Sequence, residues 1–335
     1  MIKVAINGFG RIGRLAFREI ITGTDFDVVA INDLTDAEQL AYLLKYDTNH
    51  RSFHEDLITY DEDEIIISGK KRVKVYAEKD PENLPWKELG VDVVFECTGV
   101  FTNVEGCQKH ITAGAKKVIL SAPGKGDMKT VVYGVNDEIL DGSEAIISAA
   151  SCTTNCLAPV IKVLHDNLGV EKGFMTTIHA YTNDQTILDV PHKKGANARR
   201  GRAGAANIIP SSTGAASAIG LVIPELKGKL DGGSFRVPVP DGSVVDLVLE
   251  LKKSTTTEEI NKLFVDNQSD VLKFTMDPVV SSDVLGKKCG ALVDGQCTAI
   301  LDDNGKQLVK VVAWYDNEMG YTVQMLRTAK KLMNL

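Results

Sequence analysis

Residues 2–13 read IKVAINGFGRIG and decide the fold of the first part of the chain. A β-branched run of strand length comes first, and Gly8, Gly10 and Gly13 then follow with the spacing G-x-G-x-x-G. Apolar side chains recur at helical intervals beyond them, so a tight glycine turn is predicted to join a strand to a helix. Such a turn lets a pyrophosphate group approach the backbone and meet the positive end of the helix dipole.

A second strand, predicted over residues 27–31, leads into Asp33. Asp33 follows Gly13 by about 20 residues, the separation at which an acidic side chain accepts a hydrogen bond from the adenosine ribose of a dinucleotide. The alternative interpretation of Asp33 is a turn residue or helix cap before Leu34. Together with the glycine turn, Asp33 predicts a dinucleotide site, and its negative charge favours NAD over NADP.

A second informative stretch, residues 151–156 with the sequence SCTTNC, follows a short apolar strand predicted at 145–150. The apolar spacing beyond it predicts a helix that Ser151 caps and Gly169 ends. Cys152 then lies in the first turn, where unpaired N–H groups and the helix dipole favour the thiolate. A small buried packing residue is the alternative interpretation, but the polar neighbours favour a nucleophile.

A possible base for this cysteine lies downstream. The strand predicted over residues 173–181 alternates, so His179 shares one face with Met175 and Thr177. By itself His179 could be a hydrogen-bonded structural histidine. Cys152 and His179 together suit nucleophilic catalysis with an activating base.

The composition favours a two-domain protein of a reducing compartment. The chain has 335 residues, 44% of them hydrophobic, and its six cysteines include no C-x-x-C pair. It has no apolar run of membrane-spanning length, and its N-terminus leads directly into the first strand, so we expect a cytoplasmic protein. The net charge of −7 argues against nucleic acid as a primary partner and against a membrane surface, although residues 181–210 contain a basic segment that could suit an RNA.

Two pairs of residues could suggest a metal, namely Cys152 with Cys156 and His50 with His54. Each pair is spaced i, i+4. The cysteine pair has no His or further Cys nearby at zinc spacing, and a solvated loop is the favoured interpretation of the histidine pair. We therefore expect no metal.

The remaining patterns predict an α/β Rossmann-type doubly wound NAD domain plus an α+β catalytic domain with a mainly antiparallel sheet. Further strands of the first domain are predicted at residues 73–77, 91–96, 117–121 and 145–150. Beyond Cys152, residues 245–252 alternate as in an antiparallel strand with one solvated face. A last strand at 309–314 precedes a terminal helix.

At this point the sequence resembles the phosphorylating, NAD-dependent glyceraldehyde-3-phosphate dehydrogenases. The resemblance rests on the order and spacing of NGFGRIGR, INDLTD, ASCTTNCLAPV, TTIHAYTNDQ, IIPSSTGAA, FRVPVP and WYDNEMGY. It implies an NAD-binding domain of residues 1–151 with 317–335, a catalytic domain of residues 152–316, and a homotetramer. It also implies the glycolytic oxidation of D-glyceraldehyde 3-phosphate with NAD and inorganic phosphate to 1,3-bisphosphoglycerate, through a thioester on the cysteine.

The resemblance further implies roles for individual residues. Cys152 and His179 are catalytic. The substrate phosphate is held by Thr182 and Arg236, and the attacking phosphate by Ser151, Thr153, Thr213, Gly214 and Arg200. The cofactor is bound by Gly8, Gly10, Arg11, Ile12, Gly13, Asp33, Lys79, Ser121 and Asn317.

Some alternatives stay open from the sequence. Residues 194–198 make the segment before the arginine pair longer than is usual in the family, so either Arg199 or Arg200 could reach the phosphate. Lys79 stands where the family often has Arg. Tyr315 could lie beside the nicotinamide or be a core aromatic. Erythrose-4-phosphate dehydrogenase uses the same apparatus, a cysteine hydrolase uses the same pair of residues, and a surface or RNA-binding protein could use the same fold.

Overall fold

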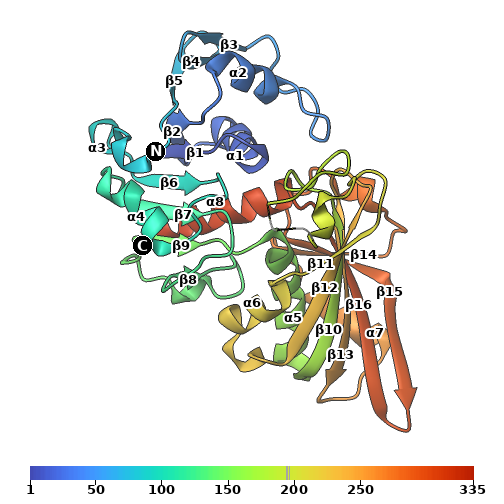
Figure 1. Ribbon diagram of the computed structural model, residues 1–335. Helices are drawn as coiled ribbons and strands as arrows, with labels where there is room; N and C mark the ends of the chain where they lie inside the picture. The colour runs from blue at the N-terminus through green and yellow to red at the C-terminus, as the bar shows by residue number, and fades with distance from the viewer. Residues whose placement is uncertain (194, 196) are drawn as a thin grey trace. The chain divides into compact units, whose positions relative to one another are not determined.

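The computed structural model describes residues 1–193, 195 and 197–335 (Figure 1). The chain divides into two compact units. The first unit comprises Met1–Tyr133, Asp137–Ser151 and Met325–Leu335, and the second comprises Gly134–Asn136 and Cys152–Gln324.

The sheet of the first unit has nine strands among the described residues, in the order β3-β4-β5-β2-β1-β6-β7-β9-β8. All neighbours pair in parallel except β3 with β4 and β4 with β5, which form an antiparallel edge. The strands are β1 (Ile2–Asn7), β2 (Phe26–Asn32), β3 (Ile58–Asp61), β4 (Glu64–Ile67), β5 (Lys71–Tyr76), β6 (Val93–Glu96), β7 (Lys117–Leu120), β8 (Lys129–Thr130) and β9 (Ile146–Ser148).

The helices of the first unit begin at residues suited to cap them. Asp36 caps α2 (Ala37–Lys45) and Asn103 caps α4 (Val104–Thr112), each by accepting from a backbone N–H. α1 (Arg11–Thr22) follows the glycine turn, and α3 (Trp86–Leu89) is short. Strands β1, β6 and β7 and helices α3 and α4 contribute to one apolar cluster that includes Ala5, Leu84, Trp86, Val94, Cys107 and Leu120.

Polar residues end three neighbouring strands of this sheet. Asn7 of β1 lies opposite Asn32 of β2 on one side and opposite Glu96 of β6 on the other. Because parallel strands end at the same edge, the glycine turn, Asp33 and Glu96 all lie at that edge.

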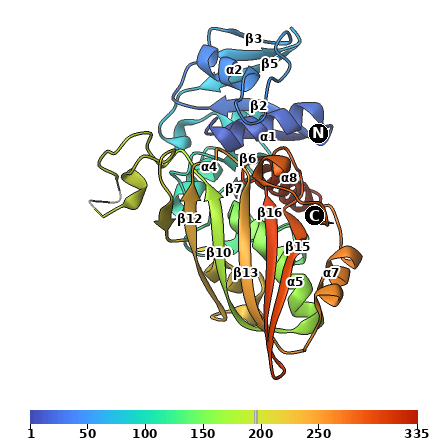
Figure 2. The ribbon, with the colours of Figure 1, turned by 90° about the vertical axis from the view of Figure 1, so that its right-hand side faces the viewer.

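The second unit contains a mainly antiparallel sheet in the order β11-β12-β10-β13-β16-β15-β14, and Figure 2 shows its central strands side by side. Among the described strands of this second sheet, only two pairs are parallel, β10 with β12 and β14 with β15. The strands are β10 (Val170–Ala180), β11 (Ile209–Ser211), β12 (Leu230–Val237), β13 (Ser243–Leu251), β14 (Leu272–Thr275), β15 (Ala291–Asp303) and β16 (Lys306–Tyr315).

The long helix α5 (Cys152–Leu168) packs against four strands of this sheet, β10, β13, β15 and β16. It ends where predicted, at Gly169, whose φ of +71° suits glycine. The other helices of the unit are α6 (Ala215–Val222) and α7 (Thr257–Asp266), which begins with a capping box from Thr256 and Glu259.

The sequence did not predict two features of the fold. The hairpin of β3 and β4 adds an antiparallel edge to the first sheet. The last helix, α8 (Met319–Met333), joins the first unit only from Met325, whereas residue 317 was expected to begin the return. Its first turns are held in the second unit, because Gln324 donates to the carbonyl of Lys288 at 2.9 Å.

Candidate active site

Cys152 is the first residue of α5 and follows a sharp turn after β9. Ala150 in this turn is buried and has a φ of +59°, a left-handed conformation that strains any residue with a Cβ atom. The turn places Cys152 in the first turn of the helix, as the sequence predicts. The N–H groups there have no acceptor within the helix, and the helix dipole favours negative charge on the sulfur.

His179 lies beside Cys152. Its Nε2 is 3.4 Å from the Cys152 sulfur, and the side chain is 3% exposed. Met175 and Thr177 share the buried face of β10 with it, as the predicted alternation requires. The structure therefore brings together the two residues that the sequence pairs as nucleophile and base.

Arg236, the register partner of His179 on β12, contacts the other nitrogen of the imidazole. Its Nη1 is 2.7 Å from Nδ1 and donates to the Ala180 carbonyl at 2.9 Å, and Nδ1 is itself 2.7 Å from that carbonyl oxygen. If Nδ1 donates to Ala180, Nε2 can accept the proton of Cys152. If Nδ1 accepts from Arg236, Nε2 carries the proton and can donate it. His179 can thus serve as proton acceptor or donor without moving its ring.

Burial and charge set the protonation of this pair. Burial lowers the pKa of His179 to about 3, and the charges of Arg236 and Arg200 act in the same direction. Burial raises the pKa of Cys152 above its ordinary value, although the charge of Arg236 and hydrogen bonds with Thr153 oppose the rise. The sequence predicts a lowered thiol pKa from the helix terminus alone, and burial acts against that prediction. These shifts favour the thiol form of Cys152 and the neutral form of His179 near pH 7.

Asp184 joins the polar groups around Arg236. The Thr182 hydroxyl accepts from Arg236 at 3.3 Å and donates to one carboxylate oxygen of Asp184, and Arg200 forms an ion pair with the other oxygen. Burial acts to raise the pKa of Asp184, but these hydrogen bonds and charges lower it below its ordinary value. Thr182, Arg200 and Arg236 are predicted from the sequence, whereas Asp184 is not, because nothing in its local pattern marks it.

One donor of this cluster lacks an acceptor. The Nε of Arg236 is buried and has no hydrogen-bond partner among the described residues. Buried N–H groups almost always have partners. A guanidinium in this condition, close to the His179 imidazole, suits an anionic group that accepts from it.

The two arginines with ambiguous spacing differ in their surroundings. Arg200 is partly buried, pairs with Asp184 and donates to the Ser211 hydroxyl at 3.4 Å, whereas the Arg199 side chain is exposed. Both line a cavity of about 460 Å³ together with Ser211 and Ser212. The charge of Arg200 also acts to lower the pKa of Arg236 and of His179.

Helix α6 begins close in sequence to this cavity. Gly214 is its N-cap residue and provides no side-chain hydrogen bond to the first turn, while Thr213 accepts from the Ala215 N–H at 3.2 Å. The helix N-terminus is therefore open to an anion.

The glycine turn after β1 is shaped for close approach of a ligand. Gly8 has a φ of +90°, and a Cβ atom there would lie 2.7 Å from the Thr98 nitrogen. A Cβ atom at Gly13 would lie 2.1 Å from the Gly8 carbonyl oxygen, whereas the space at Gly10 is open. Gly10 provides no side-chain cap for α1, so the N–H groups of the first turn suit a pyrophosphate.

Asp33 lies at the end of β2 and holds this turn. One carboxylate oxygen accepts from the Phe9 N–H at 2.7 Å and the other accepts from the Thr35 N–H at 3.1 Å. Asp33 is thus a turn residue as well as a potential ribose ligand, because each oxygen retains a further lone pair.

Comparisons with known proteins agree with this geometry. Residues 2–104 match the family model described as the NAD binding domain of glyceraldehyde 3-phosphate dehydrogenase, and residues 151–317 match that of the C-terminal domain. The chain belongs to the glyceraldehyde-3-phosphate dehydrogenase family. A glyceraldehyde-3-phosphate dehydrogenase of Clostridium pasteurianum is 59% identical over 328 residues, which cover 98% of this chain and 97% of the relative. One of Streptococcus pyogenes is 56% identical over 329 residues, which again cover 98% and 97%.

The family assignment makes NAD the cofactor, and the glycine turn fits it. The Arg11 guanidinium forms an ion pair with Asp47. Burial acts to raise the pKa of Asp47, but the hydrogen bonds from Arg11 and nearby backbone N–H groups lower it to about 2. This pair therefore remains ionised at neutral pH.

Three further residues proposed for the cofactor have different surroundings. Lys79 is exposed, and the backbone N–H of Ser121 donates to the Glu96 carbonyl at 3.0 Å. Asn317 is buried in the second unit, and the Ser243 hydroxyl donates to its side-chain oxygen at 2.6 Å, which fixes its amide group. Tyr315 packs against the imidazole of His179, with ring centroids 5.9 Å apart.

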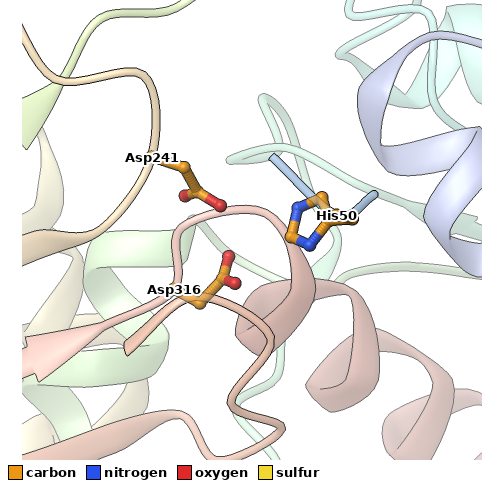
Figure 3. A group of neighbouring side chains, drawn as sticks. All are labelled: His50, Asp241 and Asp316. Atoms are coloured by element: carbon orange, nitrogen blue, oxygen red, sulfur yellow. The ribbon is translucent and has the colours of Figure 1, made fainter. Parts of the chain in front are cut away.

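A possible metal cluster has a structural explanation. Figure 3 labels the carboxylates of Asp241 and Asp316, both of which belong to the second unit. Asp316 accepts from the N–H groups of Gly286 and Met319, both at 2.7 Å, so its carboxylate fixes a loop and the start of α8. Within either unit, the described residues form no group of three potential ligands. The absence of a metal stays a prediction.

Proposed function

We propose that the protein catalyses the NAD-dependent oxidative phosphorylation of D-glyceraldehyde 3-phosphate to 1,3-bisphosphoglycerate in glycolysis. The observation that carries the proposal is the contact of 3.4 Å between the Cys152 sulfur and His179 Nε2, with Arg236 at the opposite nitrogen. The identities of 56–59% to proteins called glyceraldehyde-3-phosphate dehydrogenase support the same substrate. No described helix is both long and apolar enough to cross a membrane, and we expect the enzyme in the cytoplasm.

The reaction begins with a proton transfer. Nε2 of His179 accepts the thiol proton, and the Cys152 sulfur attacks the aldehyde carbon to form a hemithioacetal. The protonated imidazole and the N–H groups at the start of α5 then stabilise the oxygen of this adduct, and the imidazole transfers its proton to that oxygen, which becomes a hydroxyl and leaves His179 neutral. NAD supplies the hydride acceptor when it is bound.

The oxidised product is a thioester on Cys152. His179 accepts the hydroxyl proton of the hemithioacetal as the carbon loses its hydride. A phosphate oxygen then attacks the thioester carbon, the carbon–sulfur bond breaks, and the thiolate recovers a proton from His179. The buried imidazole has a hydrogen-bond donor near each nitrogen, the Arg236 guanidinium at Nδ1 and the Cys152 thiol at Nε2. This arrangement suits a ring that alternately accepts and donates a proton.

Two anion sites serve the two phosphates. We assign the substrate phosphate to Arg236 and Thr182, which are already joined by a hydrogen bond, and Arg236 also retains a buried N–H for an acceptor. We assign the attacking phosphate to Ser151, Thr153, Arg200, Thr213 and Gly214. We prefer Arg200 to Arg199 because the Arg199 side chain is exposed, whereas Arg200 is partly buried and pairs with Asp184.

We also propose a homotetramer. The loop after β10 exposes two adjacent apolar residues, Ile187 at 85% and Leu188 at 72%, and the outer face of β10 exposes Phe174 at 68%. Apolar side chains in such positions suit contacts between subunits. Light scattering should give about four times 36.3 kDa. An active monomer at micromolar concentration would contradict the tetramer and leave the reaction unaffected.

An absorbance assay for NADH tests the proposed reaction. We expect steady turnover only with D-glyceraldehyde 3-phosphate, NAD and phosphate together, and a single burst when phosphate is omitted. Faster turnover with erythrose 4-phosphate would favour erythrose-4-phosphate dehydrogenase. Aldehyde turnover that does not depend on phosphate would contradict the proposal.

A further inference from the structure

The Tyr315 hydroxyl connects the two elements that carry the catalytic pair. It lies 2.8 Å from the Thr153 hydroxyl on α5 and 2.8 Å from the Thr177 hydroxyl on β10. Thr153 follows Cys152 directly. Thr177 lies two residues before His179, on the same face of β10. All three hydroxyl groups belong to side chains that are at most 4% exposed. Water therefore cannot replace these hydrogen bonds.

The chain of hydroxyl groups leads to the nucleophile. The Thr153 oxygen is 4.0 Å from the Cys152 sulfur. A thiolate has no proton, so a hydrogen bond between them exists only if Thr153 donates. Thr153 must then accept from Tyr315, and Tyr315, whose one proton is in use, must accept from Thr177. Burial raises the pKa of Tyr315 well above its ordinary value, which keeps this proton on the phenol.

We propose that Tyr315 is a positioning residue that orients the Thr153 hydroxyl so that it donates to the Cys152 sulfur when the thiolate forms. Its ring also packs edge-on against His179, at an interplanar angle of 77°. Tyr315 thus helps to hold the base in place with its ring and supports the nucleophile with its hydroxyl. This inference rests on the proposed role of Cys152 as the nucleophile.

Other groups act on the same sulfur. His179 Nε2 lies 3.4 Å from it, the charges of Arg236 and Asp241 act on the pKa of Cys152, and the charge of Cys152 acts on the pKa of Cys156. A substitution that removes only the Tyr315 hydroxyl leaves all four in place. Tyr315→Phe is such a change, because it retains the aromatic ring.

The test is the rate of iodoacetamide alkylation of Cys152 as a function of pH, with the modified residue identified by mass spectrometry. Tyr315→Phe should raise the apparent pKa of the thiol by about half a unit to one unit, which slows alkylation about three- to tenfold below the midpoint. The limiting rate at high pH should not change. Thr177→Val should shift the profile in the same direction by a smaller amount, and Thr176→Val, on the opposite face of β10, should leave it unchanged.

Each outcome separates this inference from the proposed function. A Tyr315→Phe profile that superimposes on the wild-type profile overturns the inference. An equal shift in Thr176→Val also overturns it, because the effect would then be a general disturbance of β10. If alkylation of Cys152 leaves activity intact, the nucleophile itself is wrongly assigned, whatever the profiles show.

Discussion

Each unit buries a histidine in a polar network, and the two networks differ in how completely they are satisfied. In the first unit, Glu96 accepts from Asn7 at 2.6 Å, from the Thr98 N–H at 2.8 Å and from His110 Nε2, which is 3.0 Å away. Trp86 donates to His110 Nδ1 at 3.0 Å. His110 therefore has one tautomer, with its proton on Nε2, and both nitrogens are occupied.

In the second unit, the network around His179 has competing arrangements. Nδ1 lies within hydrogen-bond distance of both a donor on Arg236 and an acceptor on Ala180, and Nε2 faces a sulfur. The Nε of Arg236 lacks a partner among the described residues. The comparison teaches that a fully satisfied network fixes a structure, whereas one with alternative proton positions and an unused donor suits chemistry on a ligand.

Substitution of His179 should have the largest effect and should appear in the rate. We expect His179→Asn to lower kcat/KM by a factor on the order of 10²–10⁴, because the acceptor for the thiol proton is lost. The temperature of unfolding should stay the same or rise, since a desolvated imidazole beside two cations is removed. Steady-state kinetics and thermal unfolding measure the two effects. A near-native rate would remove His179 from the mechanism.

Substitution of Glu96 should appear mainly in the free energy of unfolding, whereas substitution of His179 appears in the rate. Glu96→Gln places an amide donor against the donors of Asn7 and His110, and should lower the free energy of unfolding by about 2–3 kcal/mol. NAD affinity should also fall, because this network joins the ends of β1 and β6 beside the glycine turn. Glu105→Gln, an exposed residue of α4, is the control. Denaturant unfolding of all three proteins decides whether the network is structural, and unchanged stability of Glu96→Gln would contradict that role.

Substitutions of Arg236 and Arg200 should affect different phosphates, the first that of the substrate and the second the attacking phosphate. Arg236→Ala should raise KM for the phosphorylated aldehyde with little change on glyceraldehyde, and Arg200→Ala should slow phosphorolysis but leave the first NADH burst. Loss of one charged hydrogen bond corresponds to about 1.5–3 kcal/mol, or one to two powers of ten. Arg199→Ala is the matched control. If Arg199→Ala shows the phosphorolysis defect instead, the assignment of Arg200 is wrong although the reaction stands.

A smaller effect of His179 should appear in the pH dependence of stability. Its pKa in the folded chain is about 3, below the ordinary value of 6.5. Between these values the unfolded chain binds a proton that the folded chain does not, so this residue makes stability fall as pH falls, by up to about 1.4 kcal/mol per pH unit. His179→Asn should flatten the fall between about pH 6.5 and the acid limit of folding. Parallel stability curves for wild type and variant would contradict a neutral, buried His179.

The sequence predicts those parts of the site that depend on local order. The glycine turn and the position of Cys152 at a helix start follow from spacings within a few residues, and both are confirmed. The contact between His179 and Arg236 depends on the register of β10 with β12, which are far apart in the sequence, so no local pattern predicts its geometry. Asp184 is likewise identified only by what surrounds it in space. Burial, which raises the thiol pKa of Cys152, is also a property of the folded unit alone.

In the proposed reaction, Cys152 forms the acyl intermediate and His179 is its base. The most direct measurement is mass spectrometry of the protein after reaction with D-glyceraldehyde 3-phosphate and NAD, with phosphate omitted, in parallel with the NADH burst. We expect one acyl group per chain, located on Cys152 and released on addition of phosphate, with slower formation in His179→Asn. An NADH burst without acylation, or an acyl group on Cys156 or another cysteine, would contradict it.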